Sequence, residues 1–313
     1  MMESGQMREN ENYFDSDIDL REIYNVLKMT RKLIFKIITI FAILSTAYSL
    51  ILTDYYKSEA LLLARSSSET QGGLSQYSGL AAIAGLSLPS AGEDKAAQTI
   101  ELIKSRNFVR HLLTFDDILP SIMAAKSYDR DSKEILFDQK LYNSESKTWI
   151  RKPINNRIIP SYLEAHEHYI ENMLSIYKDD ETGFISIHIE HISPIFAKNF
   201  LDLIIQETNE LLRRKDMEES MQGLEYLTSE LSKTPFIEMK ESINALIESQ
   251  LETQMMTKIN QDYILKEIEP PFIPEEASRP NRILIIILSS ILGGLLSVFF
   301  VLIRHYYFSG EEQ

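Results

Sequence analysis

The sequence predicts an α+β protein: an α/β base domain, anchored to a membrane by two transmembrane helices, carries a long extended helical hairpin. Two apolar runs, residues 33–52 and 283–303, have the length that a helix needs to cross about 30 Å of hydrocarbon. Residues 195–234 keep helical spacing with Gly223 as their only breaker, which predicts a helix about 60 Å long at 1.5 Å per residue.

The N-terminal apolar run is predicted to be a membrane span rather than a cleaved secretory signal. A signal has a shorter apolar core, about 7–15 residues, that follows a brief basic segment. Here a long mixed-charge segment, residues 1–32, comes first, and residues 20–27 within it have the spacing of a short amphipathic helix. Lys36 lies one turn inside the span, where its ammonium group can still reach the headgroups.

Basic residues predict the orientation of the two spans. Arg304 follows the second span, and four cations crowd the N-terminal side of the first, namely Lys28, Arg31, Lys32 and Lys36. Arg279 and Arg282 lie on the opposite side, but long translocated loops largely escape the rule and the first helix usually dominates. We therefore expect residues 1–32 and 304–313 in the cytoplasm and residues 53–282 in the periplasm or outside the cell.

The large loop between the spans is acidic. Residues 53–282 contain 37 Asp and Glu against 25 Lys and Arg, within a chain of 313 residues and net charge −14. This balance argues against nucleic acid and against anionic lipid headgroups as partners. The chain has no cysteine, so its stability must come from a buried core or from oligomerisation rather than from disulfides.

Residues 53–193 are predicted to form most of the base. Residues 56–64 and 184–191 have the alternation of strands, and residues 96–113 have helical spacing. Ser161 and Glu164 match a capping box that opens a helix to about Tyr177. Two segments receive no secondary-structure assignment. Residues 65–95 are rich in Ser, Gly and Ala, which predicts a flexible insertion or a small-residue contact surface, and residues 116–160 have no clear pattern.

The helical hairpin is assigned to residues 195–263. Its first helix narrows to a seam at spacings of four and three: Met217, Met221, Leu224, Thr228 and Leu231. The Thr234-Pro235 pair either kinks this helix or turns it into a second one, and we favour the turn because the chain must return to the membrane. Residues 264–269 are expected to rejoin the base as a strand.

A proline-rich strap, residues 270–282, follows the hairpin and leads into the second span. Its prolines forbid a continuous helix, because proline lacks the backbone donor and clashes with the preceding turn. We therefore expect a stiff, extended connection that contains Pro270, Pro271, Pro274 and Pro280.

The sequence motifs that signal catalysis or metal binding are absent or incomplete in this sequence. It contains no phosphate-binding GxxxxGK[ST] loop, no GxGxxG, no thiol and no carboxylate spacing that singles out a glycosidase pair. Two histidine pairs could suggest zinc, but the side chains of each pair would point in different directions: two residues apart on a helix for His166 and His168, and three apart on a strand for His188 and His191. We therefore interpret them as surface or core histidines. The calcium-like start at Asp129 lacks the required glycine and glutamate. We therefore predict a protein without catalytic residues, metal or cofactor.

Small residues recur at four-residue spacing in both spans, a pattern that lets helices approach closely in lipid. Ser45 and Ser49 share this spacing, although serine and glycine are also common in spans generally. The predicted packing residues are Ser289, Gly293, Gly294 and Ser297 in the second span and Ala42 and Thr46 in the first.

Three stretches resemble the Wzz-type chain-length determinant family. These proteins are polysaccharide co-polymerases of bacterial inner membranes, and the resemblance is to the two-span class that has no kinase domain. The three stretches are DLREIYNVL with the span and YKSEALLLA after it, the small-residue segment SGLAAIAGLSLPSAGEDK with the helix that follows, and FIEMKESINALIESQ through to the strap EPPFIPEEASRPNR. Residues 116–160 are not separately matched. The strap and the small-residue segment are the specific features.

This resemblance implies a non-enzymatic inner-membrane regulator of the chain length of O-antigen or a related surface polysaccharide. It implies a homo-oligomeric ring, a separate membrane polymerase and a lipid-linked glycan as partners, and no nucleic acid. Two other classes stay open: a two-span sensor or receptor with a periplasmic ligand-binding domain, and a scaffold for polysaccharide export.

Overall fold

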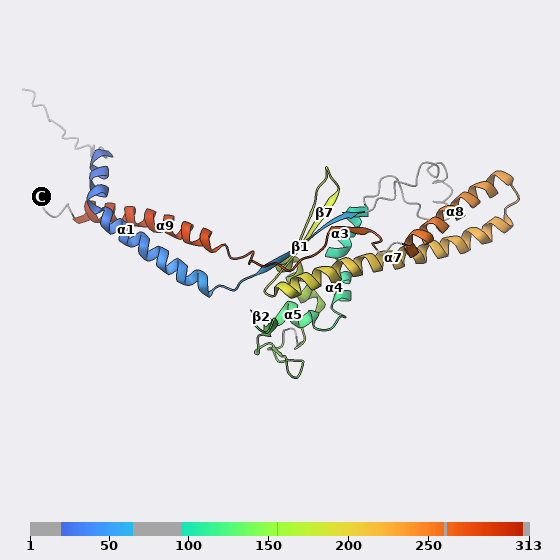
Figure 1. Ribbon diagram of the computed structural model, residues 1–313, viewed down its shortest axis with the longest axis horizontal. Coiled ribbons are helices and arrows are strands. Elements are labelled where there is room, and N and C mark those ends of the chain that lie inside the picture. Colours follow the sequence, from blue (N-terminus) through green and yellow to red (C-terminus); the bar gives the residue numbers. More distant parts are fainter. Residues whose placement is uncertain (1–19, 65–94, 155, 260–261, 309–313) are drawn as a thin grey trace, which may run out of the picture. The chain divides into compact units, whose positions relative to one another are not determined.

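The computed structural model describes residues 20–64, 95–154, 156–259 and 262–308. They belong to two compact units (Figure 1): the first holds the two terminal helices, and the second comprises residues 53–279. The Ser-, Gly- and Ala-rich segment lies outside the described residues, apart from Lys95.

The terminal unit consists of α1, Leu20–Ile51, and α9, Arg282–Phe308, which lie side by side and run in opposite directions (Figure 1). Both helices are long and apolar enough to cross a membrane, over Tyr24–Ile51 and Arg282–His305. The predicted amphipathic segment at residues 20–27 is therefore not a separate helix but the first turns of α1, because no breaker stands between it and the apolar run.

The second unit is built on a four-stranded antiparallel sheet with the order β6-β7-β1-β8. Two of its strands were predicted closely, β1 at Tyr56–Ala64 and β7 at Phe184–His191. The other two are β6, Leu174–Lys178, and β8, Leu265–Glu269, the expected return strand. Burial alternates along β7 as the sequence alternates, so its inward isoleucines join the core.

Helices cover the inward face of this sheet. The core contains Leu62 and Ile187 from the strands, and Phe108 and Phe200 from α4, Arg106–Leu112, and α7, Pro194–Lys233. The helix predicted over residues 96–113 is interrupted, because the Ser105 side chain accepts a hydrogen bond from the Phe108 N–H and caps a new helix after α3, Lys95–Lys104.

The helix predicted from Ser161 to Tyr177 is shorter than expected. The capping box is present at Ser161 and Glu164, but α6 covers only Tyr162–His168 and continues as the π-helical turn η3, Tyr169–Met173. The prediction of helix up to Tyr177 is wrong. Tyr177 lies in β6, where pairing with the preformed edge of β7 overrides local helical spacing.

The segment without a sequence assignment folds into short elements. A helix, α5 at Ile118–Ala124, leads directly into the hairpin of β2, Ala125–Asp129, and β3, Glu134–Phe137. A second small hairpin pairs β4, Tyr142–Asn143, with β5, Thr148–Trp149. Elements of two to seven residues are too short to give a clear period, which is why the sequence showed none.

Helix α7 and α8, Ile237–Ile259, form an antiparallel hairpin that turns at Thr234 (Figure 1). The alternative of a kinked rod is wrong, because α8 packs back along α7 through Leu227, Ile243 and Leu246. The predicted fold class is thus confirmed: a mixed helix and sheet base with a helical hairpin and two candidate membrane helices.

Candidate functional site: terminal helices, strap and hairpin

The face of α9 that meets α1 consists of small residues spaced four apart. Gly293 and Ser297 are buried, and the Gly293 backbone lies so close to Phe41 that a Cβ atom there would sit 2.8 Å from the Phe41 Cβ and Cγ atoms. At Gly294 a Cβ atom would meet Ile38 Cδ1 at an ordinary 3.6 Å. Close approach of the two backbones therefore depends on Gly293 more than on Gly294.

The remaining predicted packing residues differ in their positions. Ser289 and Ala42 are half-buried, whereas Thr46 is exposed and its hydroxyl donates a hydrogen bond to the Ala42 carbonyl in its own helix, at 2.7 Å. Ser45 and Ser49 are the buried pair on α1. Both pairs have the same spacing, so only the rotation of α1 about its axis selects Ser45 and Ser49.

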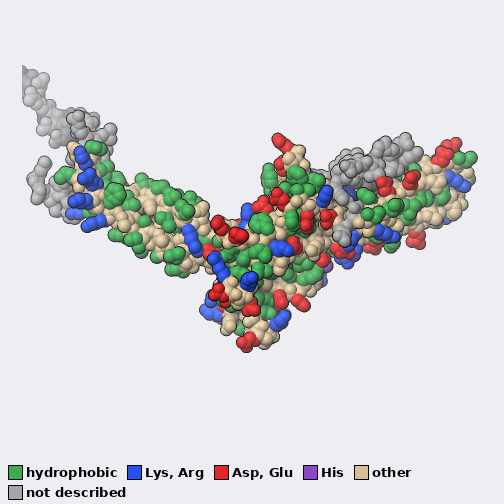
Figure 2. Space-filling view, in the orientation of Figure 1, with side chains coloured by type: hydrophobic (Ala, Val, Ile, Leu, Met, Phe, Trp, Pro, Cys, Tyr) green, Lys and Arg blue, Asp and Glu red, His purple; other side chains and the backbone are tan. Residues whose placement is uncertain are grey.

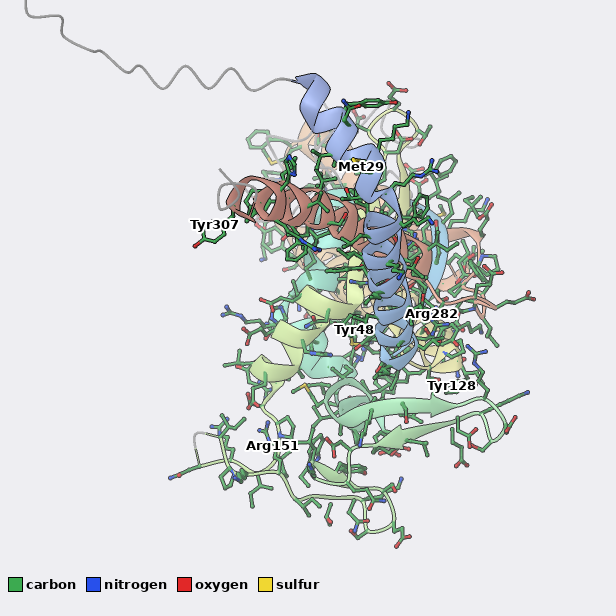
Figure 3. The ribbon with its side chains drawn as sticks, turned by 90° about the vertical axis from the view of Figure 1, so that its left-hand side faces the viewer. Met29, Tyr48, Tyr128, Arg151, Arg282 and Tyr307 are labelled. Atoms are coloured by element: carbon green, nitrogen blue, oxygen red, sulfur yellow. The ribbon has the colours of Figure 1, made fainter. Side chains whose placement is uncertain are left out.

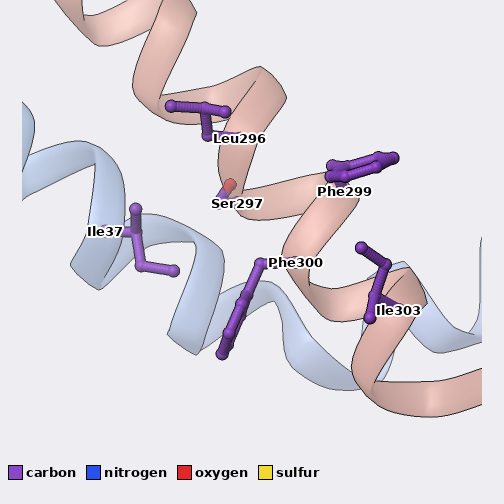
Figure 4. Close-up of a pocket in the computed structure, with 6 residues that line it drawn as sticks. All are labelled: Ile37, Leu296, Ser297, Phe299, Phe300 and Ile303. Atoms are coloured by element: carbon purple, nitrogen blue, oxygen red, sulfur yellow. The ribbon is translucent and has the colours of Figure 1, made fainter. Parts of the chain in front are cut away.

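A shallow depression of about 410 Å³ lies along this helix pair. Figure 4 shows Ile37 of α1 near Ser297 and Phe300 of α9, and Leu296, Phe299 and Ile303 complete the lining. The one polar side chain, Ser297, already donates to the Gly294 carbonyl at 2.7 Å. The surface therefore suits apolar neighbours, such as acyl chains, rather than a polar ligand.

Charge is unevenly distributed over the molecule (Figure 2). The terminal helices are largely covered by hydrophobic side chains, with Lys and Arg gathered at the N-terminal end of α1, while Asp and Glu are spread over the base and the helical hairpin. The cations at this end include Lys28, Arg31 and Lys32, all exposed. This is the distribution on which the predicted orientation depends.

The proline-rich strap is non-helical from Pro270 to Asn281 and lies along the start of β1. The Ser58 hydroxyl donates to the Phe272 carbonyl at 2.8 Å, and Tyr55 exchanges backbone hydrogen bonds with Ser278 and Arg279 at 2.7 and 2.9 Å. Arg279 also forms an ion pair with Glu190. These contacts hold the first and last residues of the second unit beside each other.

The four strap prolines occupy different environments. Pro271 and Pro274 are buried, Pro280 is half-buried and Pro270 is exposed. Because proline offers no N–H group, the buried pair can pack against the base without leaving a backbone donor unsatisfied. Their burial shows that the strap is part of the base and not a free linker.

The predicted seam of the helical hairpin is confirmed in part, because Met217, Leu224 and Leu231 are half-buried and Leu231 packs against the hairpin core. Met221 and Thr228 are exposed, while Ser220, Gly223 and Leu227 are buried. The Ser220 hydroxyl donates to the Gln250 carbonyl at 2.7 Å, an arrangement that only small residues allow. Sequence reasoning treated Gly223 as a breaker and did not count Ser220 as a contact residue, because neither is apolar in the pattern.

The histidines that raised the question of a metal site bond within the fold. His166 contacts the Lys104 carbonyl at 2.8 Å, and His188 lies 3.4 Å from Glu59. His191 bridges the Ser121 carbonyl and the Ser193 N–H, and burial lowers its pKa to about 4. Among the described residues no group of three or more His, Asp or Glu side chains could hold a metal ion.

The start of the calcium-like motif serves as a turn. The Asp129 carboxylate accepts hydrogen bonds from the Asp131 N–H at 2.9 Å and the Ser132 hydroxyl at 3.0 Å, in the loop between β2 and β3. These bonds lower the pKa of Asp129. An aspartate that closes a tight hairpin loop explains the motif without an ion.

The sequence matches the model of the Wzz family, described as chain length determinant protein, over residues 16–114. The predicted resemblance to Wzz-type chain-length determinants is confirmed. The match covers less than half of the chain and includes the described elements α1, β1, α3 and α4. It supports a Wzz-type regulator of chain length, in a protein with apolar helices near both ends.

The solved structures that are similar to this chain include two polysaccharide co-polymerases. One is a full-length bacterial polysaccharide co-polymerase, 12% identical with a TM-score of 0.45, and the comparison covers 94% of this chain and 100% of that one. The other is a fragment of WzzB, a polysaccharide co-polymerase from Salmonella Typhimurium, 12% identical with a TM-score of 0.28, covering 72% of this chain and 100% of that one. A comparison with curated proteins gives no match.

Proposed function

We propose that this protein is a non-enzymatic regulator of surface polysaccharide length that works as a homo-oligomer beside a separate membrane polymerase. The match to the chain length determinant model carries the proposal. In the proposed topology the base and the helical hairpin are in the periplasm, and both termini are in the cytoplasm of a bacterial cell.

The mechanism that we infer is geometric. A ring of helical hairpins around the growing, lipid-linked glycan would limit how far the chain extends before it leaves the polymerase. The pinned strap supports this idea, because the hydrogen bonds of Tyr55 to Ser278 and Arg279 tie the two ends of the base together. Because these hydrogen bonds join the two ends of the base, the two membrane helices would be attached to one rigid domain and not to two separately mobile chain ends.

Deletion of the gene and electrophoresis of the surface polysaccharide test this function. We expect polymer of dispersed length without a preferred range, which complementation restores. Loss of all polymer would favour an export scaffold instead, and an unchanged ladder with altered signalling would favour a receptor. Crosslinking in the native membrane, followed by size analysis, tests the ring: a chain that stays single in lipid contradicts it.

Helix packing in the terminal unit has its own test. Gly293→Ala forces a Cβ atom to within 2.8 Å of Phe41, whereas the Cβ atom of Gly294→Ala meets Ile38 at 3.6 Å. We expect Gly293→Ala to lower the thermal stability of the reconstituted protein and to broaden the polysaccharide length distribution, and Gly294→Ala to do neither. Equal behaviour of the two variants would contradict the packing role.

A further inference from the structure

An exposed apolar and basic surface lies in the loop between β5 and α6. Four isoleucines expose about half of their surface to solvent, at 52%, 50%, 47% and 59%, and they line the loop together with the half-buried Trp149: Ile150, Ile154, Ile158 and Ile159. We call these five residues the isoleucine patch. Trp149, Ile158 and Ile159 line one shallow depression together with Arg157, and exposed apolar residues of this kind on an otherwise acidic domain mark a contact surface.

A buried ion pair fixes the conformation of the loop that carries the isoleucine patch. Arg151 is 8% exposed, donates to the Ile158 carbonyl at 2.7 Å and grips both Glu164 carboxylate oxygens at 2.6 and 3.2 Å (Figure 3 labels Arg151). Ile154 and Arg157 close the tip with two backbone hydrogen bonds. The isoleucines are thus displayed on a preformed turn, and binding would not require the loop to be ordered first.

The charge around the patch is opposite to that of the whole chain. No Asp or Glu occurs from residue 146 to 163, although the chain carries a net charge of −14. Lys152 and Arg157 are exposed beside the isoleucines, while Lys147 is paired with Asp117 at 3.3 Å. The overall acidity predicted that anionic headgroups would be avoided, but the charge of this loop differs from that of the whole chain, so that expectation does not apply to this surface.

The covalent connections favour a lipid surface as the partner. Only four residues separate the end of α1 from β1, and two separate Arg279 from α9, so the base is held within reach of any bilayer that these helices enter. Such tethering gives the lipid surface a high effective concentration. Tryptophan, isoleucine and cations without acidic residues are the side chains that settle at the boundary of acyl chains and headgroups.

We propose that the isoleucine patch docks on an anionic phospholipid surface, with Trp149 and the isoleucines at the acyl boundary and Lys152 and Arg157 against lipid phosphates. The base would then contact the bilayer at a third place besides its two helices. This inference needs membrane insertion of the helices, but it does not depend on the regulation of polysaccharide length.

Trp149 is the only tryptophan of the chain, so the full-length protein carries its own probe at the patch. We suggest reconstituting the chain into vesicles of phosphatidylcholine, with or without phosphatidylglycerol, whose acyl chains carry bromine near the headgroup. Selective excitation of Trp149 should show strong quenching, greater with phosphatidylglycerol, and high salt should reduce the difference because it screens the cations.

Two variants and a control sharpen the measurement. Arg157→Ser should lower the docking equilibrium constant about fivefold, the value of one cation near an anionic surface. The double variant Ile158→Ser with Ile159→Ser should lower it about tenfold or more through lost apolar contact. Ile237→Ser, which changes a 71% exposed isoleucine on the helical hairpin, should leave the quenching unchanged.

Three results would overturn the docking. Emission that is insensitive to brominated lipid but quenched by aqueous iodide means that the patch faces water. Emission that resists both quenchers, and becomes sensitive to iodide when the protein is diluted in lipid, means that a second copy covers it. A chain that fails to float with the vesicles refutes both the docking and the membrane anchoring of the proposed function, whereas flotation without quenching refutes the docking alone.

Discussion

The base and the helical hairpin belong to the same unit, but they are stabilised in different ways. The base encloses one continuous core of strands and helices in which residues such as Leu62, Ile187 and Phe200 are fully buried. The core of the hairpin consists of Leu227, Ile243 and Leu246, with two half-buried neighbours. The base therefore has the burial of a self-sufficient domain, while the hairpin has the burial of a two-helix contact.

The outer surface of the helical hairpin reinforces this contrast. Large apolar side chains are exposed along both helices, including Met221, Tyr226, Leu251 and Met255. Several of its ion pairs are local and solvated, such as Lys215 with Glu219 at 3.8 Å, and pairs of that kind contribute little. The hairpin is expected to open at lower free energy than the base.

Truncation in the base should have the largest effect. Ile187→Ala removes a fully buried side chain between Ala60 and Ile176 on the neighbouring strands. We expect a loss of about 4 kcal/mol in the free energy of unfolding, because the sheet cannot collapse into the cavity. Denaturant unfolding of the full chain in detergent, followed by circular dichroism, measures this loss. A loss below about 1 kcal/mol would contradict a rigid core.

The junction between the two regions should come next. The buried Asn209 side chain accepts from the Ile264 and Leu265 N–H groups at 2.9 and 2.8 Å and donates to the Leu265 carbonyl at 3.0 Å. Asn209→Ala leaves these groups unpaired and should cost about 3 kcal/mol. Hydrogen exchange should show loss of protection in β8, and Asn209→Asp, which keeps the acceptor, should lose less. Unchanged protection of β8 would mean that Asn209 does not hold it.

A truncation in the helical hairpin should be smaller and local. Leu227→Ala is expected to cost about 2 kcal/mol, the low end for buried leucine, because two helices can close over the gap. Hydrogen exchange should accelerate in α8 but not in β1 or β7. Met221→Ala, at a 55% exposed position on α7, is the control and should have almost no effect. Acceleration throughout the sheet would show that the two regions unfold as one.

Acid should lower the stability of the base before that of the helical hairpin. This is expected to be the smallest of the four predicted effects. The Arg151 guanidinium and the Ser161 N–H hold the pKa of Glu164 at about 2, below its ordinary value of 4.5. A lowered carboxyl pKa adds stability that is complete above pH 4.5 and is lost as the pH falls towards 2. Glu164→Gln should lower stability at neutral pH and flatten this part of the pH profile. A profile parallel to that of the parent chain below pH 4.5 would exclude the Glu164 contribution.

Periodicity in the sequence predicted the elements that are long or regular. The strands β1 and β7, the start of α7 within one residue of the predicted residue 195, and the capping box at Ser161 follow from local rules, because alternation, helical spacing and a serine cap act within a few residues. The strap could be predicted as non-helical for the same reason, since each proline removes a donor wherever it stands.

Other features depended on partners far away in the chain. Strand β6 replaces a predicted helix because β7 offers it an edge, and Ser220 and Gly223 join the seam of the helical hairpin because α8 approaches there. The selection of Ser45 and Ser49 over Thr46 depends in the same way on how α1 is rotated against α9. Residues 125–149 form pairs too short to have a period.

The sequence by itself determined the two apolar helices, the acidic base between them and the family resemblance, because hydropathy, charge and proline content are properties of the chain in any conformation. Only the tertiary structure decided that the Thr234 turn makes a hairpin, that the strap is pinned to β1, and that basic and apolar side chains meet in one exposed loop. The hairpin and the pinned strap need contacts between residues far apart in sequence, and their energy exists only once the surrounding elements have packed. The loop residues are neighbours in sequence, but their exposure is set by the fold around them.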